Sequence, residues 1–211
     1  YYKGEGVQKD YKKAVEWYKK AADQGNANAQ TILGNMYYNG EGVQKDIKQA
    51  VEWNKKAADQ GNAIAQNSLG YMYETGKGVE KDYKKAVDLY KKAAAQGYVE
   101  SYNYLGAMYY NGKGVQKDFN QAVKWFEKAA DQGYAEAQYS LGMMYLNEKD
   151  YKRAAYWFEK ASDQGDEKAQ FNLGIMYENG YGVQKDYKHA AYWFSLSCNG
   201  GFKEACLMLK N

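Results

Sequence analysis

The chain is 211 residues long, with 45% hydrophobic residues and a net charge of +3 from 29 basic and 26 acidic side chains. This hydrophobic content is enough for a folded core and excludes a disordered tail. Lysine recurs evenly along the chain, so nothing predicts a nucleic-acid partner. No apolar run approaches the roughly 20 residues that span a bilayer, so we expect no transmembrane segment. Proline is absent while glycine occurs 22 times, so glycine should make the turns.

Short sequence marks recur along the chain at a fixed period. A glycine that closes a Gln-Gly or equivalent step recurs at spacings of 36, 36, 36, 32 and 36 residues, with Leu-Gly and Lys-Asp pairs between. A period of this length is the signature of a repeat array, so we expect one elongated solenoid. Its predicted parts are a half unit that holds only a second helix (1–25), full units (26–61, 62–97, 98–133, 134–165 and 166–201) and a C-terminal capping helix (202–211).

The leading half unit lacks a first helix. Residues 1–4 match residues 37–40, so the helix predicted after Asp10 leaves an apolar face around Val15 and Trp17 without its usual partner. We expect a shortened chain, a further upstream unit or a self-association contact at this end. The sequence starts at Tyr1 without Met, so a signal peptide or other upstream segment is left open.

Each full unit predicts two helices, seen first at about 29–38 and about 47–59. Asp46 and its equivalents lie where an N-cap carboxylate would accept from the free first-turn amides. Gly61 and its equivalents follow the second helix, where a left-handed residue is wanted. Between the helices, residues 40–43 form a glycine turn with one apolar anchor.

The apolar residues of the second helix recur at helical spacing and predict a stripe that faces the core. In the first full unit this stripe holds Ala50, Val51, Trp53, Ala57 and Ala58. Aromatic residues that recur in nearly every unit should pack between neighbouring repeats instead of forming a site. They are Tyr37, Tyr73, Tyr109, Tyr145 and Tyr177, together with Trp17, Trp53, Trp125, Trp157 and Trp193. The Leu-Gly pair indicates a close approach of helices, where a Cβ would clash.

The motifs together resemble a known repeat. Ala-x-x-x-Leu-Gly-x-Met-Tyr, then Gly-x-Gly-Val-x-Lys-Asp-Tyr, then Ala-x-x-Trp-Tyr-x-x-Ala-Ala-x-Gln-Gly is similar to the Sel-1-like repeat, a relative of the tetratricopeptide repeat, over essentially all 211 residues. The resemblance implies an all-α fold, a right-handed α/α solenoid (superhelix) of antiparallel helix pairs. It also implies an adaptor or binding scaffold, commonly bacterial and at or beyond the cell envelope, and in some members an immunity or regulatory protein that blocks an effector.

The sequence departs from the pattern in two ways. The usual proline after Gly-Val is Gln or Glu throughout. The unit 134–165 lacks the Gly-x-Gly-Val segment and connects its helices through residues 147–150. This deletion predicts a tighter turn and a local irregularity in the superhelix.

The first helices of the five full units can be compared with one another. At 100° per residue, the near-constant positions and the varying positions fall on separate sides of the helix. In helix-pair solenoids the first helix usually lines the concave surface, so we predict that the varying side forms a groove for a protein or peptide. The predicted groove residues are Ile32, Asn35, Tyr38, Tyr71, Tyr104, Tyr110, Tyr139, Met143, Phe171 and Ile175. The alternative is that some of them pack against the second helix of their own unit.

Residues for catalysis are sparse, and we predict a non-enzymatic protein without cofactor or metal. Gly40-x-Gly42 lacks the third glycine of a dinucleotide fingerprint and reads as a turn. His189, the only histidine, replaces a lysine on a face expected to be solvated. No two histidines or several cysteines have zinc-ligand spacing, and no serine begins a Ser-x-x-Lys motif. The rival class is an enzyme that acts on cell-wall material or β-lactams, as associated with some cysteine-rich relatives.

Two cysteines lie eight residues apart at the last repeat boundary. Cys198 takes the place of Ala22 and Cys206 that of Gln30, on antiparallel neighbours whose Cβ atoms can reach disulfide distance. This spacing resembles the cysteine-rich secreted branch of the family, in which each boundary is stapled. We therefore expect a disulfide and a periplasmic or secreted protein. The alternative is two buried free thiols in a cytoplasmic protein.

Overall fold

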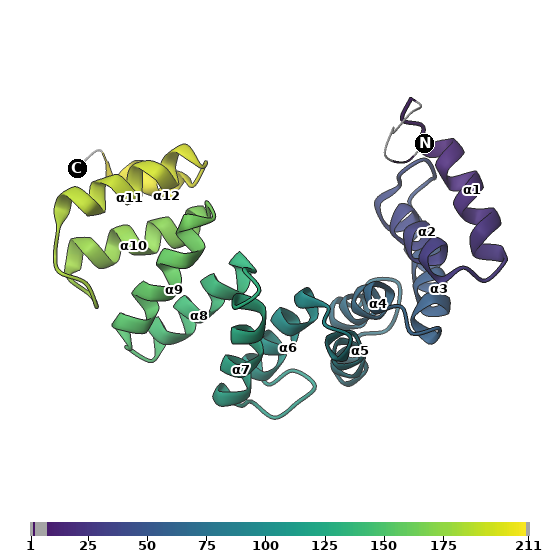
Figure 1. The fold of residues 1–211 in the computed structure, drawn as a ribbon, viewed down its shortest axis with the longest axis horizontal. Coiled ribbons are helices and arrows are strands. Elements are labelled where there is room, and N and C mark those ends of the chain that lie inside the picture. The colour runs from purple at the N-terminus through teal and green to yellow at the C-terminus, as the bar shows by residue number, and fades with distance from the viewer. Residues whose placement is uncertain (1, 3–7, 210–211) are drawn as a thin grey trace. The chain divides into compact units, whose positions relative to one another are not determined.

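The structure, a computed structural model, describes residue 2 and residues 8–209 (Figure 1). Throughout this part of the chain the regular structure is α-helical. The chain divides into two compact units that each hold several repeats: a first unit, Tyr1–Phe119, and a second unit, Asn120–Asn211. No helix in the described ranges has the length and apolar character needed to cross a membrane.

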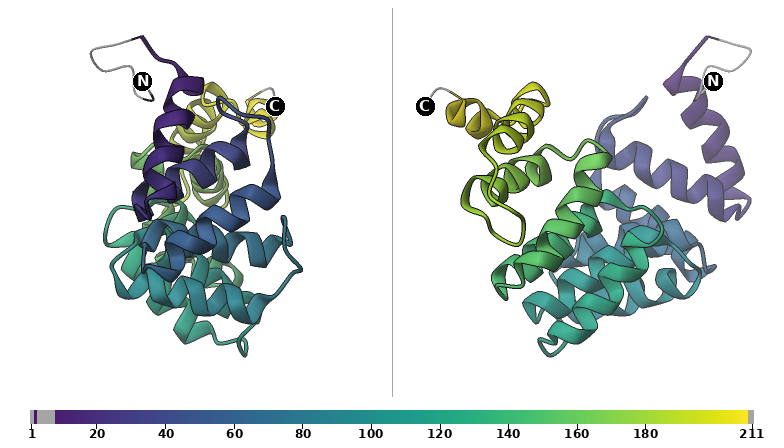
Figure 2. Two further views of the ribbon diagram at one scale, coloured as in Figure 1. Left: turned by 90° about the vertical axis from the view of Figure 1, so that its right-hand side faces the viewer. Right: turned by 60° about the vertical axis from the view of Figure 1, so that its left-hand side comes forward.

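In the first unit each helix packs against the next one in the chain. Figure 2 gives two further views of this succession. The helices are α1 (Tyr11–Asp23), α2 (Ala27–Asn39), α3 (Ile47–Asp59), α4 (Ala63–Thr75), α5 (Tyr83–Ala95) and α6 (Val99–Asn111). Even-numbered helices are the first helices of the repeats, and odd-numbered helices are the second.

The second unit continues the alternation, and its helices from α8 onward pack in chain order. They are α7 (Phe119–Ala130), α8 (Ala135–Asn147), α9 (Tyr151–Asp163), α10 (Glu167–Asn179), α11 (Tyr187–Asn199) and α12 (Lys203–Met208). The predicted all-α solenoid of helix pairs is confirmed.

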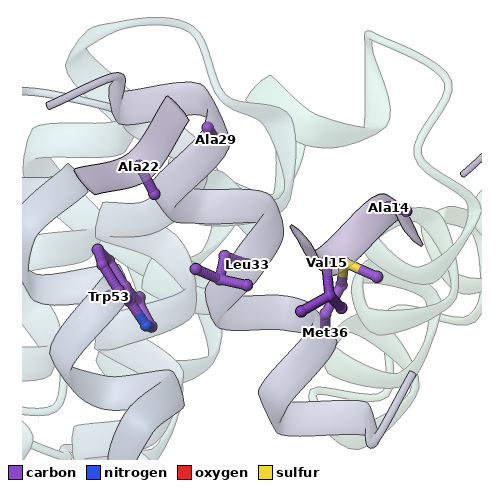
Figure 3. Close-up of a cluster of buried hydrophobic side chains, with 7 residues drawn as sticks. All are labelled: Ala14, Val15, Ala22, Ala29, Leu33, Met36 and Trp53. Atoms are coloured by element: carbon purple, nitrogen blue, oxygen red, sulfur yellow. The ribbon is translucent and has the colours of Figure 1, made fainter. Parts of the chain in front are cut away.

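The core is built where three consecutive helices meet. Figure 3 shows one such cluster, in which α1, α2 and α3 bring together seven buried side chains: Ala14, Val15, Ala22, Ala29, Leu33, Met36 and Trp53. Small alanines let the helix axes approach, and Leu, Met and Trp fill the space between them. The stripe predicted on the second helix is largely buried, with Ala50, Trp53, Ala57 and Ala58 inside.

Not every recurring aromatic residue is in the core. Tyr145 and Trp53 are buried, as expected. The prediction is wrong for Trp17, which is 59% exposed. Within the described residues α1 packs chiefly on α2, which leaves one side of Trp17 uncovered, and the ammonium of Lys20 lies 4.5 Å from its ring centroid.

The predicted helix ends are confirmed. Asp46 caps α3, and its Oδ1 accepts from the backbone N–H of Gln49 at 3.0 Å. The same cap recurs at Asp10, Asp82, Asp150 and Asp186. At the other end of α3, Gly61 takes φ +87°, a left-handed conformation that glycine adopts without steric cost.

Each glycine turn is docked onto the second helix of the preceding repeat. The N–H of Lys77, at the centre of one turn, donates to the carbonyl of Met72 at 3.1 Å. A Cβ on the following Gly78 would lie 2.7 Å from Cγ2 of Ile47 and 3.0 Å from Cγ2 of Val51, both on α3. The Gly-x-Gly motif therefore serves close packing between repeats, as expected for a structural turn.

The short repeat closes its turn without glycine. Lys149 adopts φ +60°, the left-handed region, and the N–H of Asp150 donates to the carbonyl of Tyr145 at 2.8 Å. In the longer turns the equivalent bond runs from Asp46 to Tyr37 at 3.0 Å. The predicted tighter turn is confirmed, with the same exit bond and fewer residues between.

A ladder of buried glutamines joins successive repeats. Gln30 Nε2 donates to the carbonyl of Ala22 at 3.0 Å, and its Oε1 accepts from Gln60 Nε2 at 2.7 Å. Equivalent bonds, also eight residues apart, join Gln66 to Ala58 and Gln138 to Ala130. At the last boundary the same two positions hold Cys198 and Cys206, which form the predicted disulfide with a Cα–Cα distance of 4.9 Å. The covalent bond thus replaces one rung of the ladder.

Candidate binding face on the first helices

The ten residues predicted to line a groove all lie on first helices and are all partly exposed. Six are in the first unit: Ile32, Asn35 and Tyr38 on α2, Tyr71 on α4, and Tyr104 and Tyr110 on α6. The other four are in the second unit: Tyr139 and Met143 on α8, and Phe171 and Ile175 on α10. We call the surface formed by these positions in either unit the first-helix face.

In the first unit four of the six come together in one pocket of about 180 Å³. Its lining consists of Asn35, Tyr38, Asn67, Ser68, Tyr71, Met72 and Tyr104, and we call it the tyrosine pocket. Three consecutive first helices contribute to it. The other two residues lie elsewhere: Ile32 packs against the cluster of Figure 3, and Tyr110 has the ammonium of Lys117 5.6 Å from its ring centroid.

The rings of the tyrosine pocket are held from behind. Tyr104 stacks on Tyr90 of α5 with ring centroids 4.8 Å apart and planes 6° from parallel. Tyr90 is fully buried, and its hydroxyl donates to Glu74 Oε2 at 2.8 Å, while burial and this carboxylate raise the pKa of the phenol. Tyr71 leans against Tyr104 with a centroid distance of 6.2 Å. The pocket therefore has a wall that is fixed before any ligand arrives.

Lys77 is a residue of this face that was absent from the sequence prediction. Its ammonium donates to the hydroxyls of Tyr38 at 2.8 Å and Tyr71 at 3.2 Å, and so joins two repeats. Those two hydrogen bonds raise the pKa of Lys77, which stays charged at neutral pH. The residue lies in a glycine turn outside the compared helices. Its variation with Glu41, Lys113 and Tyr181 at the same turn position was the available signal.

In the second unit the rings of this face also pack on other aromatic side chains. Tyr139 leans on Phe158 of α9 at 5.9 Å, and burial raises the pKa of its phenol. Phe171 contacts both Phe194 and Phe202 at centroid distances of 5.7 and 5.1 Å. Tyr139 and Phe171 thus each contact a ring on the second helix of their own repeat, which the alternative prediction describes, and both retain partial exposure.

His189 belongs to a repeated surface motif. Its Nδ1 lies 2.8 Å from Asp186 Oδ2, and its ring stacks on Tyr177 at 5.2 Å. Arg153 makes the same pair with Asp150 and covers Tyr145, and Lys85 does so with Asp82 and Tyr73. His189 is therefore one more side chain that pairs with a cap aspartate and covers a recurring tyrosine, on the exposed face that the sequence pattern indicated.

Among the described residues, four carboxyls have a lowered pKa, and each belongs to a helix cap. The backbone N–H of Lys13, Lys85 and Arg153 is the main cause at Asp10, Asp82 and Asp150. At Asp186 the main cause is the His189 side chain. A general acid needs a raised pKa, so none of these four provides one. The described residues hold no cluster of three or more metal-ligating side chains.

Fold and face together define an α/α solenoid of helix-pair repeats, a class that presents an extended surface for other molecules. The Sel1 repeat model matches residues 1–26, 27–62, 63–98, 99–134, 135–166 and 167–202, and the chain belongs to the Sel1 repeat family. Members of this family are generally non-enzymatic scaffolds for protein interaction. No match was found among curated proteins.

Solved structures support the same assignment. A protective antigen present in uropathogenic Escherichia coli strains is 39% identical, with a TM-score of 0.90 over 99% of this chain. This chain spans only 45% of that antigen's length. A Sel1 repeat protein from Oxalobacter formigenes is 33% identical, with a TM-score of 0.86, 94% of this chain and 81% of that one covered. An immunity protein from Pseudomonas aeruginosa is 26% identical, with a TM-score of 0.61 and coverages of 91% and 75%.

Proposed function

We propose that this chain is a non-enzymatic scaffold that binds a protein or peptide on its first-helix face, centred on the tyrosine pocket. The observation that carries the proposal is the set of partly exposed tyrosines from α2, α4 and α6 that line one pocket. Aromatic residues are enriched at protein interfaces because a rigid ring buries a large area at low cost in conformational entropy.

The pocket favours a polypeptide over a small molecule. Its volume of about 180 Å³ is below the roughly 300–1,000 Å³ of typical small-molecule sites and suits a single side chain. The amides of Asn35 and Asn67 beside the rings can hydrogen-bond to a peptide backbone. The prepositioned wall of Tyr104 on Tyr90 lowers the cost of ordering the site on binding.

We infer an envelope-associated or secreted location. A disulfide persists in oxidising compartments and is rare in the reducing cytoplasm, and Cys198–Cys206 is such a bond. For a protein in this location, a role as an immunity or regulatory protein that blocks an effector is supported by the 26% identity to an immunity protein from Pseudomonas aeruginosa.

The location is tested by alkylating thiols in intact cells of the native organism before lysis and denaturation. We expect no alkylation of Cys198 or Cys206 in the non-reduced sample and two alkylated cysteines after reduction. Two reactive thiols without reduction would place the protein in the cytoplasm.

The binding face is tested with the purified chain as bait for proteins extracted from the envelope and secreted fractions. A partner identified in this way should bind the wild type at least about tenfold more tightly than Tyr38→Ala/Tyr71→Ala, since buried aromatic anchors contribute about 2 kcal/mol or more. Tyr156→Ala/Tyr192→Ala is the control, because these rings are 51% and 56% exposed on the second helices α9 and α11. Equal loss in both double variants, or no loss in the first, would refute the proposal.

A further inference from the structure

The charge around the tyrosine pocket indicates what kind of polypeptide fits it. Lys77 Nζ lies 5.5 and 5.1 Å from the ring centroids of Tyr38 and Tyr71, and Lys45 Nζ lies 5.7 Å from that of Tyr38. Two ammonium groups therefore flank the same ring at the edge of the pocket where the turns lie.

Two carboxylates of this region, those of Glu74 and Glu41, are already engaged. Glu74 on α4 accepts the hydroxyl of buried Tyr90. Glu41 accepts from the Tyr2 hydroxyl and the Asn39 amide, both at 3.2 Å. These carboxylates have tyrosine and amide partners of their own, so the positive charge of Lys77 is available to a ligand.

Lys77 is held in place by more than its side-chain bonds. Its backbone N–H is tied to Met72, and the next residue, Gly78, is pressed against Ile47 and Val51. An ammonium group has three N–H donors, and tyrosine hydroxyls of two repeats accept two of them. The third remains for an acceptor brought by a ligand, beside a pocket that takes an apolar side chain. A fixed cation loses little entropy on pairing, so its pairing should contribute to affinity.

The same turn position differs in the neighbouring repeat. Lys113 is one repeat further on, but its Nζ lies 5.6 Å from the ring of Tyr83 on the second helix α5. Lys77 therefore lies at the first-helix face, whereas Lys113 lies beside a second helix. This gives a matched pair of equal charge in equivalent turns.

We propose that the tyrosine pocket selects an acidic segment of a partner protein, with an Asp or Glu carboxylate on Lys77 and an adjacent apolar side chain against the rings of Tyr71 and Tyr104 that line the pocket. This inference rests on the proposed function, because it names the chemistry of the partner at the same face. The carboxylate forms a charge-assisted hydrogen bond with the third N–H of Lys77. The two Asn amides bind the peptide backbone.

The test selects peptides from a random library displayed on phage, with three immobilised targets: the wild type, Lys77→Met and Lys113→Met. We expect the wild type and Lys113→Met to enrich peptides with Asp or Glu next to a large apolar residue. Lys77→Met should lose the acidic preference and keep the apolar one. Synthetic versions of the peptides selected on wild type should bind Lys77→Met at least about tenfold more weakly, which is the size of a lost charge-assisted hydrogen bond. Their affinity for wild type should fall as the salt concentration is raised.

Failure of this inference can be distinguished from failure of the binding face itself. Two outcomes would overturn the acidic-partner inference and leave the binding face standing. In one, the enriched peptides fail to bind Tyr38→Ala/Tyr71→Ala but carry no excess of Asp or Glu. In the other, they bind Lys77→Met as tightly as wild type. Peptides unaffected by the tyrosine double variant, or an absence of enriched peptides, would overturn both. Thermal unfolding of each variant confirms that the fold is intact.

Discussion

At the scale of single residues, the glycines of three Leu-Gly pairs, Gly70, Gly142 and Gly174, lie where the second helix of the same repeat packs an aromatic ring onto the first helix. A Cβ on Gly142 would lie 2.5 Å from Cδ1 of Phe158, and one on Gly70 would lie 2.8 Å from Cε1 of Tyr90. Both aromatic side chains are fully buried and also support rings of the first-helix face. Packing and the candidate site therefore depend on the same contact.

We expect Gly142→Ala to destabilise the protein although alanine is the better helix former. Overpacking against a fixed ring costs about 1–3 kcal/mol, and the gain in helix propensity returns at most about 1 kcal/mol. Urea unfolding should give a net loss of about 1 kcal/mol or more. In the double variant Gly142→Ala/Phe158→Leu, the two losses should be less than additive. A Gly142→Ala protein as stable as wild type would contradict the close approach.

The first-helix face could be predicted in part from the sequence. Helical periodicity placed Tyr38, Tyr71 and Tyr104 on the same side of successive helices, because packing fixes one side and leaves the other free to vary. It could not say that Tyr104 would stack on Tyr90, since that contact depends on how two helices cross. Helical periodicity does not apply to Lys77, because this residue reaches the face from a turn, where only its variation between repeats marks it.

At the scale of elements, the short turn between α8 and α9 joins its helices through a residue in an unfavourable backbone conformation. Lys149 has φ +60°, where the longer turns place glycines such as Gly40 and Gly76. A side chain other than glycine costs about 1–2 kcal/mol in this region. The deletion predicted the tighter turn, but its sequence did not reveal which residue would take the left-handed conformation.

Lys149→Gly should therefore stabilise the protein slightly. The relief of backbone strain is partly offset by the greater freedom of glycine in the unfolded chain, about 0.5–1 kcal/mol, so we expect a net gain of up to about 1 kcal/mol in urea unfolding. Lys149→Ala keeps a Cβ and removes the charge, and it should leave stability unchanged. If Lys149→Gly and Lys149→Ala change the free energy of unfolding by the same amount, the loss of the Lys149 charge, not the relief of its backbone conformation, causes the change.

The last repeat boundary exchanges a hydrogen bond for a covalent one. Cys198 and Cys206 occupy the positions that Ala22 and Gln30 join by a bond of 3.0 Å. A disulfide that closes so short a loop stabilises by about 2–3 kcal/mol in the chain-entropy model, whereas a buried hydrogen bond contributes about 1 kcal/mol. The boundary should thus be stronger than the glutamine rungs.

Two double variants separate these contributions. Cys198→Ala/Cys206→Ala should lose the full stabilisation of about 2–3 kcal/mol. Cys198→Ala/Cys206→Gln restores the pair found at the other boundaries and should recover about 1 kcal/mol of that loss. Urea unfolding without reductant measures both. Equal stability of the two variants would mean that the glutamine rung contributes nothing at this boundary.

At the scale of the whole molecule, the internal repeats made the fold predictable from a single sequence. Six units supplied an internal comparison in which N-caps, turn glycines and core alanines each recur, so local signals that are weak singly support one another. What repetition could not supply is the behaviour of positions that differ between units. Trp17 is exposed although Trp53, at the same position, is buried. The burial of a tryptophan at this position depends on the helices that pack around it and is not set by the motif.

The repeated aspartate caps give the whole chain a common dependence on acid. The pKa values of Asp10, Asp82, Asp150 and Asp186 are lowered in the folded state, chiefly by cap hydrogen bonds and, at Asp186, by His189. A group whose pKa is lowered on folding stabilises fully above its unfolded pKa, about 3.9 for aspartate, and loses that contribution as pH falls through the folded value. The melting temperature should therefore be nearly constant from neutral pH to about pH 5 and fall below about pH 4.

Asparagine in place of these four aspartates provides the matched control, because it caps helices about as well and does not titrate. The quadruple variant Asp10→Asn/Asp82→Asn/Asp150→Asn/Asp186→Asn should melt at a somewhat lower temperature at neutral pH, having lost its pairs with Lys13, Lys85, Arg153 and His189. Its melting temperature should then decline less between pH 4 and pH 2 than that of wild type. An equally steep decline would assign the acid sensitivity to other carboxylates and would remove the caps as its cause.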